Sequence, residues 1–184
     1  MIPKENSIAI QSKELFAEAL VDLLRTKPYH KINITELAQK ADLDRRTFYR
    51  NFNFKDDILA YRIKGIIEEF QESIHQQKHL DAYIIAKTYF AVCSHHVDFL
   101  TLLSEQGLMI HLLSAFDQVL PSLTEKYVRR AVDESEDDFA YVLSFYAGGF
   151  WHLSNKWLQE GIQKTPDQLA ALVPIVMKRL IMDI

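Results

Sequence analysis

Helix-breaking residues are scarce in this chain, and this scarcity limits its fold more than any other feature. Five Gly and five Pro are spread over 184 residues, and no run rich in Val, Ile and Thr alternates with polar residues. Sheets need frequent turns and a two-residue apolar period, whereas helices need an apolar residue every three or four positions. The apolar residues follow the helical pattern, beginning with those between Leu15 and Leu24. We therefore predict an all-α fold.

Three short helices are predicted near the N-terminus. The first covers residues 7–26 and ends before Pro28, because a residue that precedes proline disfavours helical backbone. The second begins after Asn33, whose side chain can cap it while Glu36 reaches back to the cap N–H. After a turn at Asp42, the third begins at Asp44 and runs to residue 51. Two short helices joined by a three- to four-residue turn are typical of a helix-turn-helix.

The rest of the chain is also predicted to be helical. Pro121 is expected to end one helix, the acidic residues 133–138 to interrupt the chain or form a turn, and Gly161 to end a long apolar helix. Thr165 and Pro166 suit the cap and first position of the last helix. We expect helices over residues 56–75, 80–94, 97–104, 108–120, 122–132, 139–160 and 165–182, and two domains, residues 1–54 and 55–184.

Charge is distributed unevenly along the chain. Residues 1–64 contain 12 Lys and Arg against 9 Asp and Glu, whereas the remaining residues contain 9 against 16. Within residues 27–55 the ratio is 7 basic to 3 acidic. A basic N-terminal part on an acidic body is typical of a protein in which only that part meets nucleic-acid phosphate. The alternative is an ordinary solvated charged surface.

Residues 44–52 have the composition that a DNA-reading helix needs. Such a helix buries one face, offers forked or short polar side chains to base edges and binds phosphates at its margins. The spacing of Leu43, Phe48 and Phe52 predicts that they pack inward. Tyr49 and Lys55 suit phosphate oxygens, and Arg suits guanine. The outer and leading surfaces are left to Arg45, Arg46, Tyr49 and Asn51. The alternative is a set of core aromatics beside solvated arginines.

The N-terminal part resembles the helix-turn-helix domain of the TetR family of bacterial transcriptional regulators. Residues 31–59 read KINITELAQKADLDRRTFYRNFNFKDDIL, close to the family form ITxxxIAxxAGVSxxTFYxHFxxKxxL, and LFAEAL at residues 15–20 matches its first helix. The resemblance covers residues 7–64. It implies a sequence-specific regulator that binds a palindromic operator as a homodimer, with base contacts from Asp44, Arg45 and Arg46. The DNA contacts that it implies in all are Asn33, Thr35, Asp44, Arg45, Arg46, Thr47, Tyr49, Arg50, Asn51 and Lys55.

Three departures from the family form affect these expectations. Asp42 stands where the family usually has Gly in the turn, and Asp tolerates left-handed backbone better than most residues. Asn51 replaces a common His and keeps its polarity with a different reach. Arg45 and Arg46 are bulkier and more basic than the usual residues, so no known operator sequence is transferred to this chain.

The C-terminal part resembles a second region of such regulators. Residues 145–161, FYAGGFWHLSNKWLQEG, are similar to the regulatory region of firmicute-type TetR-like proteins, some of which are linked to dihydroxyacetone kinase genes. We extend no such role to this chain. The resemblance implies dimerisation through the last two long helices, and the alternative is a monomeric core. The expected interface residues are Gly148, Gly149, Trp151, Leu153, Trp157, Leu172, Val176 and Leu180.

The same resemblance implies a small-molecule pocket in the C-terminal domain. Residues between 83 and 150 supply side chains that are apolar or amphipathic enough to line one. The alternative is that they are ordinary core, and nothing in the sequence identifies an effector. The candidates are Tyr89, Phe90, Cys93, Phe99, Met109, His111, Phe116, Tyr146 and Phe150.

An enzyme or a metal sensor is the alternative from another class. His75 and His79 are four residues apart, as ligands on one helix face would be. Cys93 stands near His95 and His96, which could suggest a nucleophile and its base. No third ligand accompanies the first pair, and the second group matches no catalytic motif. We therefore expect no catalysis, no metal and no cofactor.

The sequence also leads to expectations about the cellular compartment of the protein and its binding partners. A single cysteine, no signal peptide in the first residues and no apolar run of about 20 residues favour a cytoplasmic protein without a membrane partner. The expected partners are double-stranded DNA, a second copy of the chain and a small-molecule effector. A pure protein-interaction module would explain the apolar C-terminal helices but not Arg45 and Arg46.

Overall fold

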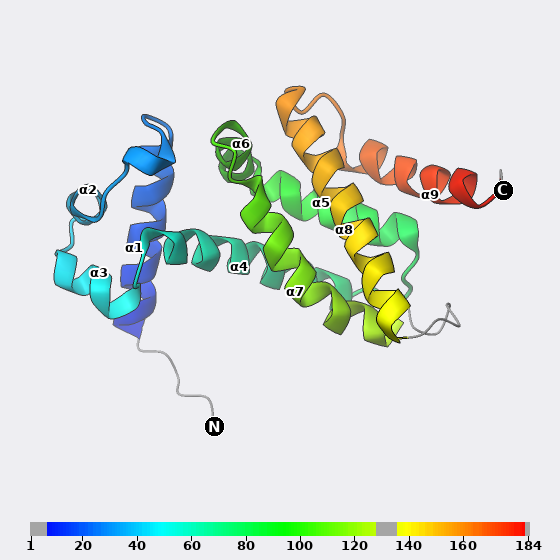
Figure 1. Cartoon of the computed structure of the whole chain (residues 1–184), viewed down its shortest axis with the longest axis horizontal. Helices are drawn as coiled ribbons and strands as arrows, with labels where there is room; N and C mark the ends of the chain where they lie inside the picture. Colours follow the sequence, from blue (N-terminus) through cyan, green and yellow to red (C-terminus); the bar gives the residue numbers. More distant parts are fainter. Residues whose placement is uncertain (1–6, 128–135, 183–184) are drawn as a thin grey trace. The chain divides into compact units, whose positions relative to one another are not determined.

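The computed structural model describes residues 7–127 and 136–182, with side chains for residues 7–118 and 140–176. Within these ranges the chain forms helices and no strand, so the all-α prediction is confirmed. The elements are α1 (Ser7–Leu24), the 3-10 helix η1 (Tyr29–Lys31), α2 (Ile34–Lys40), α3 (Arg45–Asn51), α4 (Lys55–His75), α5 (Ala82–His95), α6 (Val97–Glu105), α7 (Met109–Tyr127), α8 (Glu136–Gln159) and α9 (Pro166–Met182), as labelled in Figure 1.

The chain divides into two compact units, Met1–Lys64 and Gly65–Ile184. The division falls inside α4, so this helix contributes residues to both units. In the first unit α1, α2 and α3 pack on one another around a core that includes Leu20 and Leu37, both almost fully buried. The assignment of residues 1–54 and 55–184 to two functional domains stays a prediction.

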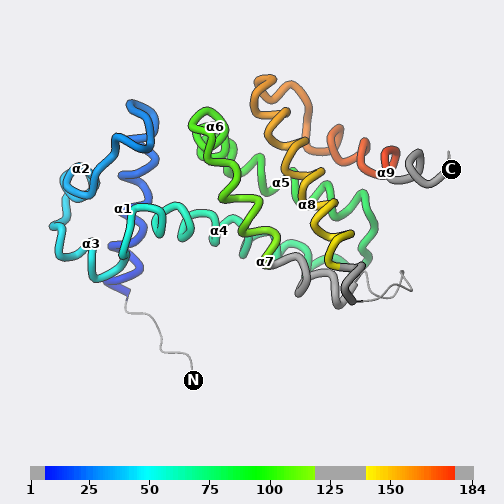
Figure 2. Tube along the Cα trace, in the orientation of Figure 1, coloured from blue at the N-terminus to red at the C-terminus, as the bar shows by residue number. Residues whose placement is uncertain are grey.

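The second unit pairs helices that are distant in sequence. In it α9 packs against α5, and α8 packs against α7 and α6, as the trace in Figure 2 shows. Asp167 of α9 accepts a hydrogen bond from the Tyr83 hydroxyl at 3.1 Å and pairs with the Lys87 ammonium at 2.7 Å. The Trp151 indole N–H of α8 donates to the Met109 carbonyl of α7 at 3.0 Å.

Turn residues end and begin the last two helices as the sequence predicted. Gly161 follows α8 with a left-handed φ of 77°, and the Ile162 N–H donates to the Trp157 carbonyl at 3.0 Å. Such a bond satisfies a carbonyl that has no partner within the helix. Pro166 is the first residue of α9, and the Thr165 hydroxyl accepts a hydrogen bond from the Gln168 N–H at 3.3 Å.

The predicted helix end at Pro121 is wrong. α7 continues through Pro121 to Tyr127, so the helix expected over residues 122–132 is not a separate element where the structure describes it. A proline removes one backbone hydrogen bond and can bend a helix without ending it. Most of the expected interruption at residues 133–138 lies outside the described residues.

No single helix of the described ranges is both long and apolar enough to cross a membrane. The segments Val97–Glu105 and Met109–Gln118 meet that test only as a pair, and they are bent by 116° at the break between them.

Candidate functional site

Three aromatic rings hold α3 against the first helix. Phe48 and Phe16 are both 0% exposed, and their ring centroids lie 5.4 Å apart in an edge-to-face contact. Phe52, 5% exposed, completes the group at 6.1 Å from Phe16 and 5.8 Å from Phe48. Burial and edge-to-face packing of such rings are both stabilising. The inward face of α3 is therefore fixed by Phe48 and Phe52, as the sequence predicted.

The remaining surface of α3 is exposed and basic. Arg45, Arg46 and Arg50 are exposed, and Tyr49 is 52% exposed although its ring touches that of Phe48 at 5.3 Å. The contact with Phe48 holds part of the Tyr49 ring, and the rest of this side chain is exposed. Forked arginine side chains suit bidentate hydrogen bonds to guanine in a major groove.

The turn before α3 takes the backbone conformation expected of it. Asp42 has a left-handed φ of 54°, and the Leu43 N–H donates to the Ala38 carbonyl at 2.9 Å, which closes the end of α2. The Asp44 carboxylate accepts a hydrogen bond from the Thr47 N–H at 2.6 Å, and this bond lowers the pKa of Asp44. Asp44 therefore caps α3 and sets the direction in which the helix begins.

Two of the remaining DNA-contact candidates are engaged within the protein. The Asn51 amide donates to the Thr47 carbonyl at 2.8 Å, and both side chains are half-buried. Asn33 forms the predicted capping box: its side-chain oxygen accepts from the Glu36 N–H at 3.0 Å, and its own N–H donates to Glu36 Oε2 at 3.1 Å. Asn33 is exposed, and the amide N–H donors of its side chain take no part in the capping box. Thr35 is exposed on the first turn of α2.

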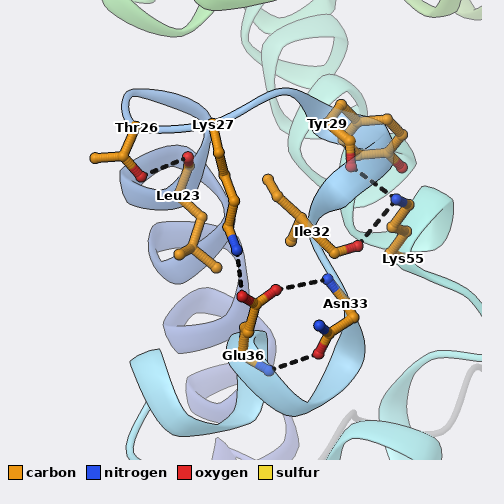
Figure 3. A network of polar contacts seen from close by, with 8 residues as sticks. All are labelled: Leu23, Thr26, Lys27, Tyr29, Ile32, Asn33, Glu36 and Lys55. Atoms are coloured by element: carbon orange, nitrogen blue, oxygen red, sulfur yellow. Dashed lines mark hydrogen bonds and ion pairs between the residues drawn. The ribbon is translucent and has the colours of Figure 1, made fainter.

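Figure 3 shows a network of polar contacts around the start of α2. The Lys27 ammonium bonds to Glu36, and this hydrogen bond lowers the pKa of the Glu36 carboxyl. On the other side the Lys55 ammonium donates to the carbonyls of Tyr29 at 2.7 Å and Ile32 at 3.0 Å. It also lies 4.3 Å from the centroid of the Tyr29 ring, within cation–π range.

Lys55 therefore ties the start of α4 to η1, a role that the sequence analysis did not include. The two carbonyls are 26 and 23 residues away in sequence, so no local pattern indicates them. An ammonium has three N–H donors, and two of them are used here. The predicted contact of Lys55 with a DNA phosphate would have to use the third donor.

Replacing Lys55 by methionine is expected to lower the free energy of unfolding of the first unit by about 1–3 kcal/mol. Methionine retains an unbranched stem but leaves the two carbonyls without their donor. Urea unfolding followed by far-UV circular dichroism measures the effect, with Lys31→Met at an exposed lysine as the control. We also expect weaker DNA binding on all sequences and a shallower salt dependence. Equal unfolding midpoints for the two variants would refute the structural tie.

In the second unit the structure brings together five of the nine effector-pocket candidates. The Tyr89 ring lies 5.1 Å from Phe90, 5.3 Å from Phe116 and 5.0 Å from Phe150, measured between centroids. Buried Cys93 belongs to the same cluster through a hydrogen bond with Tyr89. Of the other candidates, Phe99 and Met109 are buried, Tyr146 is half-buried and His111 is exposed.

A buried hydroxyl completes this cluster. Ser154, 0% exposed, has its oxygen 2.9 Å from the Tyr89 hydroxyl and 2.8 Å from the Phe150 carbonyl. Burial raises the pKa of Tyr89 and raises that of the Cys93 thiol to about 12. The thiol is therefore protonated at neutral pH and lacks the thiolate that a nucleophile needs. Sequence reasoning missed Ser154, because a serine among apolar residues of a helix carries no distinguishing pattern.

The two histidines near Cys93 pair with a carboxylate of α4. His95 Nδ1 and His96 Nε2 lie 2.7 and 2.6 Å from the two carboxylate oxygens of Glu69. α4 ends at His75, so His79 lies beyond the helix and the two do not share its face. In the part of the chain that the structure describes, no three His, Cys, Asp or Glu side chains are grouped to hold a metal ion.

The dimer-interface candidates fall into two classes. A Cβ atom on Gly148 or Gly149 would meet no atom within 4 Å, and Leu172 and Val176 are 38% and 54% exposed. In contrast, Trp157 is 3% exposed, and its indole N–H donates to the Lys164 carbonyl at 2.9 Å. Trp157 therefore belongs to the core of its own chain. Trp151 and Leu153 are half-buried, and Leu180 lies outside the residues whose side chains are described.

Other apolar side chains of α8 and α9 are also exposed. Tyr141 is 79% exposed and Phe145 69% exposed on α8, and Ile175 is 48% exposed on α9. Their sequence pattern is that of any amphipathic helix, so the sequence could not separate them from core residues.

Comparisons with known proteins agree with this arrangement. Residues 81–179 match the family model TetR_C_8, described as a transcriptional regulator C-terminal region. A 53-residue segment is 30% identical to the HTH-type dhaKLM operon transcriptional activator DhaS of Lactococcus lactis, covering 29% of this chain and 28% of that protein.

Two solved structures have a similar fold. Lin0861 from Listeria innocua aligns with a TM-score of 0.81 at 14% identity, over 98% of this chain and 96% of that one. FadR from Bacillus subtilis, solved with stearoyl-CoA, aligns with a TM-score of 0.55 at 17% identity, over 95% and 98%. Because the family model covers more than half of the sequence, the chain belongs to the TetR family of transcriptional regulators.

Proposed function

We propose that this regulator binds a palindromic operator as a homodimer and responds to a small-molecule effector in the bacterial cytoplasm. Residues 1–54 would read the DNA, and residues 55–184 would dimerise and bind the effector. The observation that carries the DNA-binding role is the division of α3 into two faces. One face is buried through Phe48, and the other exposes Arg45, Arg46 and Arg50.

A homodimer is supported by the exposed apolar side chains of the last two helices. Phe145 on α8 and Val176 on α9 are each more than half exposed. Apolar side chains of this kind, gathered on two helices, favour a protein partner. Two copies would also supply two reading helices, as a palindrome with half-sites about 34 Å apart requires.

Effector control is supported by the aromatic cluster around Tyr89. Its rings surround the neutral polar groups of Tyr89, Cys93 and Ser154, and binding sites for small molecules commonly combine apolar walls with a few such groups. The similar FadR was solved with an acyl-CoA ligand. The buried groups at this cluster are uncharged, which favours an apolar ligand part with a hydrogen-bonding group. The protonated Cys93 thiol gives no support to a catalytic role.

Fluorescence anisotropy on DNA from upstream of the chain's own and neighbouring genes tests the proposal. We expect tight, sequence-selective binding that weakens steeply between two salt concentrations, because phosphate contacts release counterions. Random DNA of equal length is the control. Binding that is absent or insensitive to salt on every fragment, with and without added cell metabolites, would refute a DNA-binding role.

A further inference from the structure

The exposed face of α8 is a stripe whose two halves differ in chemistry. Tyr141, Phe145, Gly149, His152 and Lys156 follow one another at intervals of three or four residues, so they share one helix face. The first two are aromatic rings, 79% and 69% exposed. In the middle of the face stands Gly149, and a Cβ atom built on it would meet no atom within 4 Å. The last two residues, His152 and Lys156, are exposed, and their side chains carry or can accept a positive charge. We call these residues the α8 stripe.

The residues of the two halves are spaced symmetrically about one point of the helix. Phe145 and His152 are equally far from the midpoint between Gly148 and Gly149, and so are Tyr141 and Lys156. A second α8 that runs antiparallel across this midpoint brings both aromatic rings opposite basic side chains at once. In a parallel arrangement each residue would instead meet the same residue of the partner. The aromatic rings would then meet each other, and the two Lys156 side chains would repel because they carry like charges.

We propose that two copies of the chain pack their α8 helices antiparallel, with the two-fold axis between Gly148 and Gly149. Tyr141 then stacks on the partner's Lys156, and Phe145 lies against the partner's His152. This inference rests on the proposed homodimer and defines its register. Glycine at the axis leaves room for the backbones to approach, since a Cβ there would meet only open space in the single chain. A cation over an aromatic face within about 6 Å is attractive.

The surroundings of Lys156 fit this arrangement. Lys156 pairs with Glu160 at 3.1 Å, and their side chains are 60% and 54% exposed. Such a surface pair contributes little, so the ammonium can also contact a ring. Lys156 borders a hollow of about 260 Å³ whose apolar lining includes Leu153, Trp157 and Leu172. The hollow is smaller than the roughly 300 Å³ at which small-molecule pockets begin, and in the proposed register the partner's Tyr141 would lie beside it.

Disulfide trapping tests the register in full-length protein that carries Cys93→Ser. The double variant Tyr141→Cys with Lys156→Cys is expected to form a covalent dimer under mild oxidation, because paired Cα atoms must lie within about 7 Å. Either single variant is expected to stay unlinked, because equal positions 141 of two antiparallel copies lie roughly 22 Å apart along the helices. Light scattering measures the oligomeric state, and circular dichroism checks folding.

The outcomes separate the register from the homodimer. A dimer in which the double variant stays unlinked, or in which Tyr141→Cys links alone, would overturn the register and leave the homodimer in place. A monomer at micromolar concentration would overturn the homodimer itself. In the unlinked protein, Lys156→Gln is expected to raise the dimer dissociation constant roughly 5- to 25-fold, because two symmetric contacts are lost. The exposed Lys78→Gln is the matched control, and an equal effect of both variants would count against the Lys156 contact.

Discussion

Replacing Arg45 and Arg46 together by alanine is expected to lower operator affinity at least 30-fold, since each good contact between arginine and a base contributes about 1–3 kcal/mol. Both side chains are exposed at the start of α3, whereas the Phe48 side chain is fully buried. The Asp44 cap orients that first turn, so the backbone position of the two arginines is set before DNA binds. We therefore expect the loss to fall on the cognate site and to relax sequence preference.

Anisotropy titrations on the operator and on random DNA measure this effect. The matched control replaces both arginines by lysine, which keeps the charge and loses the forked donors. If the arginines read bases, the lysine variant also loses selectivity while its affinity for random DNA stays close to that of the wild type. Equal operator affinity for the alanine variant and the wild type would contradict the assignment. An equal loss on both DNAs for the alanine variant would assign the arginines to phosphates.

The N-terminal unit could be predicted in detail because its signals are local. The capping box of Asn33, the left-handed Asp42 and the cap at Asp44 each involve residues no more than a few positions apart. At each of these positions the local backbone conformation favours a few residue types. A single sequence is therefore enough to identify the position. The same holds for Gly161 after α8.

Contacts between distant residues were not predictable in this way. Lys55 meets the Tyr29 carbonyl across 26 residues, and Ser154 meets Tyr89 across 65. An amphipathic pattern indicates which residues are apolar but not whether their own chain or a partner covers them. Trp157 was therefore expected at an interface and is buried, whereas Tyr141 of the same helix is 79% exposed and was not among the predicted residues.

Replacing Phe48 by alanine is expected to destabilise the first unit by about 3–5 kcal/mol. The side chain is 0% exposed, and its ring contacts those of Phe16 and Phe52, so the substitution leaves a cavity where α3 meets α1. A loss of this size is a large part of the stability of an ordinary domain. Because α3 presents its arginines only while Phe48 holds it, operator affinity is expected to fall with stability.

The positions of the two tryptophans allow the effect to be located. Trp151 and Trp157 both belong to the second unit, so their fluorescence follows its unfolding, whereas far-UV circular dichroism follows both units. For Phe48→Ala in urea we expect part of the helical signal to be lost at lower concentration while the fluorescence midpoint stays unchanged. Phe48→Leu fills more of the cavity and should retain most of the stability. If both unfolding transitions of Phe48→Ala matched those of the wild type, the proposed anchoring role of Phe48 would be refuted. An equal shift of both signals would mean that the two units unfold together and that both are destabilised by the substitution.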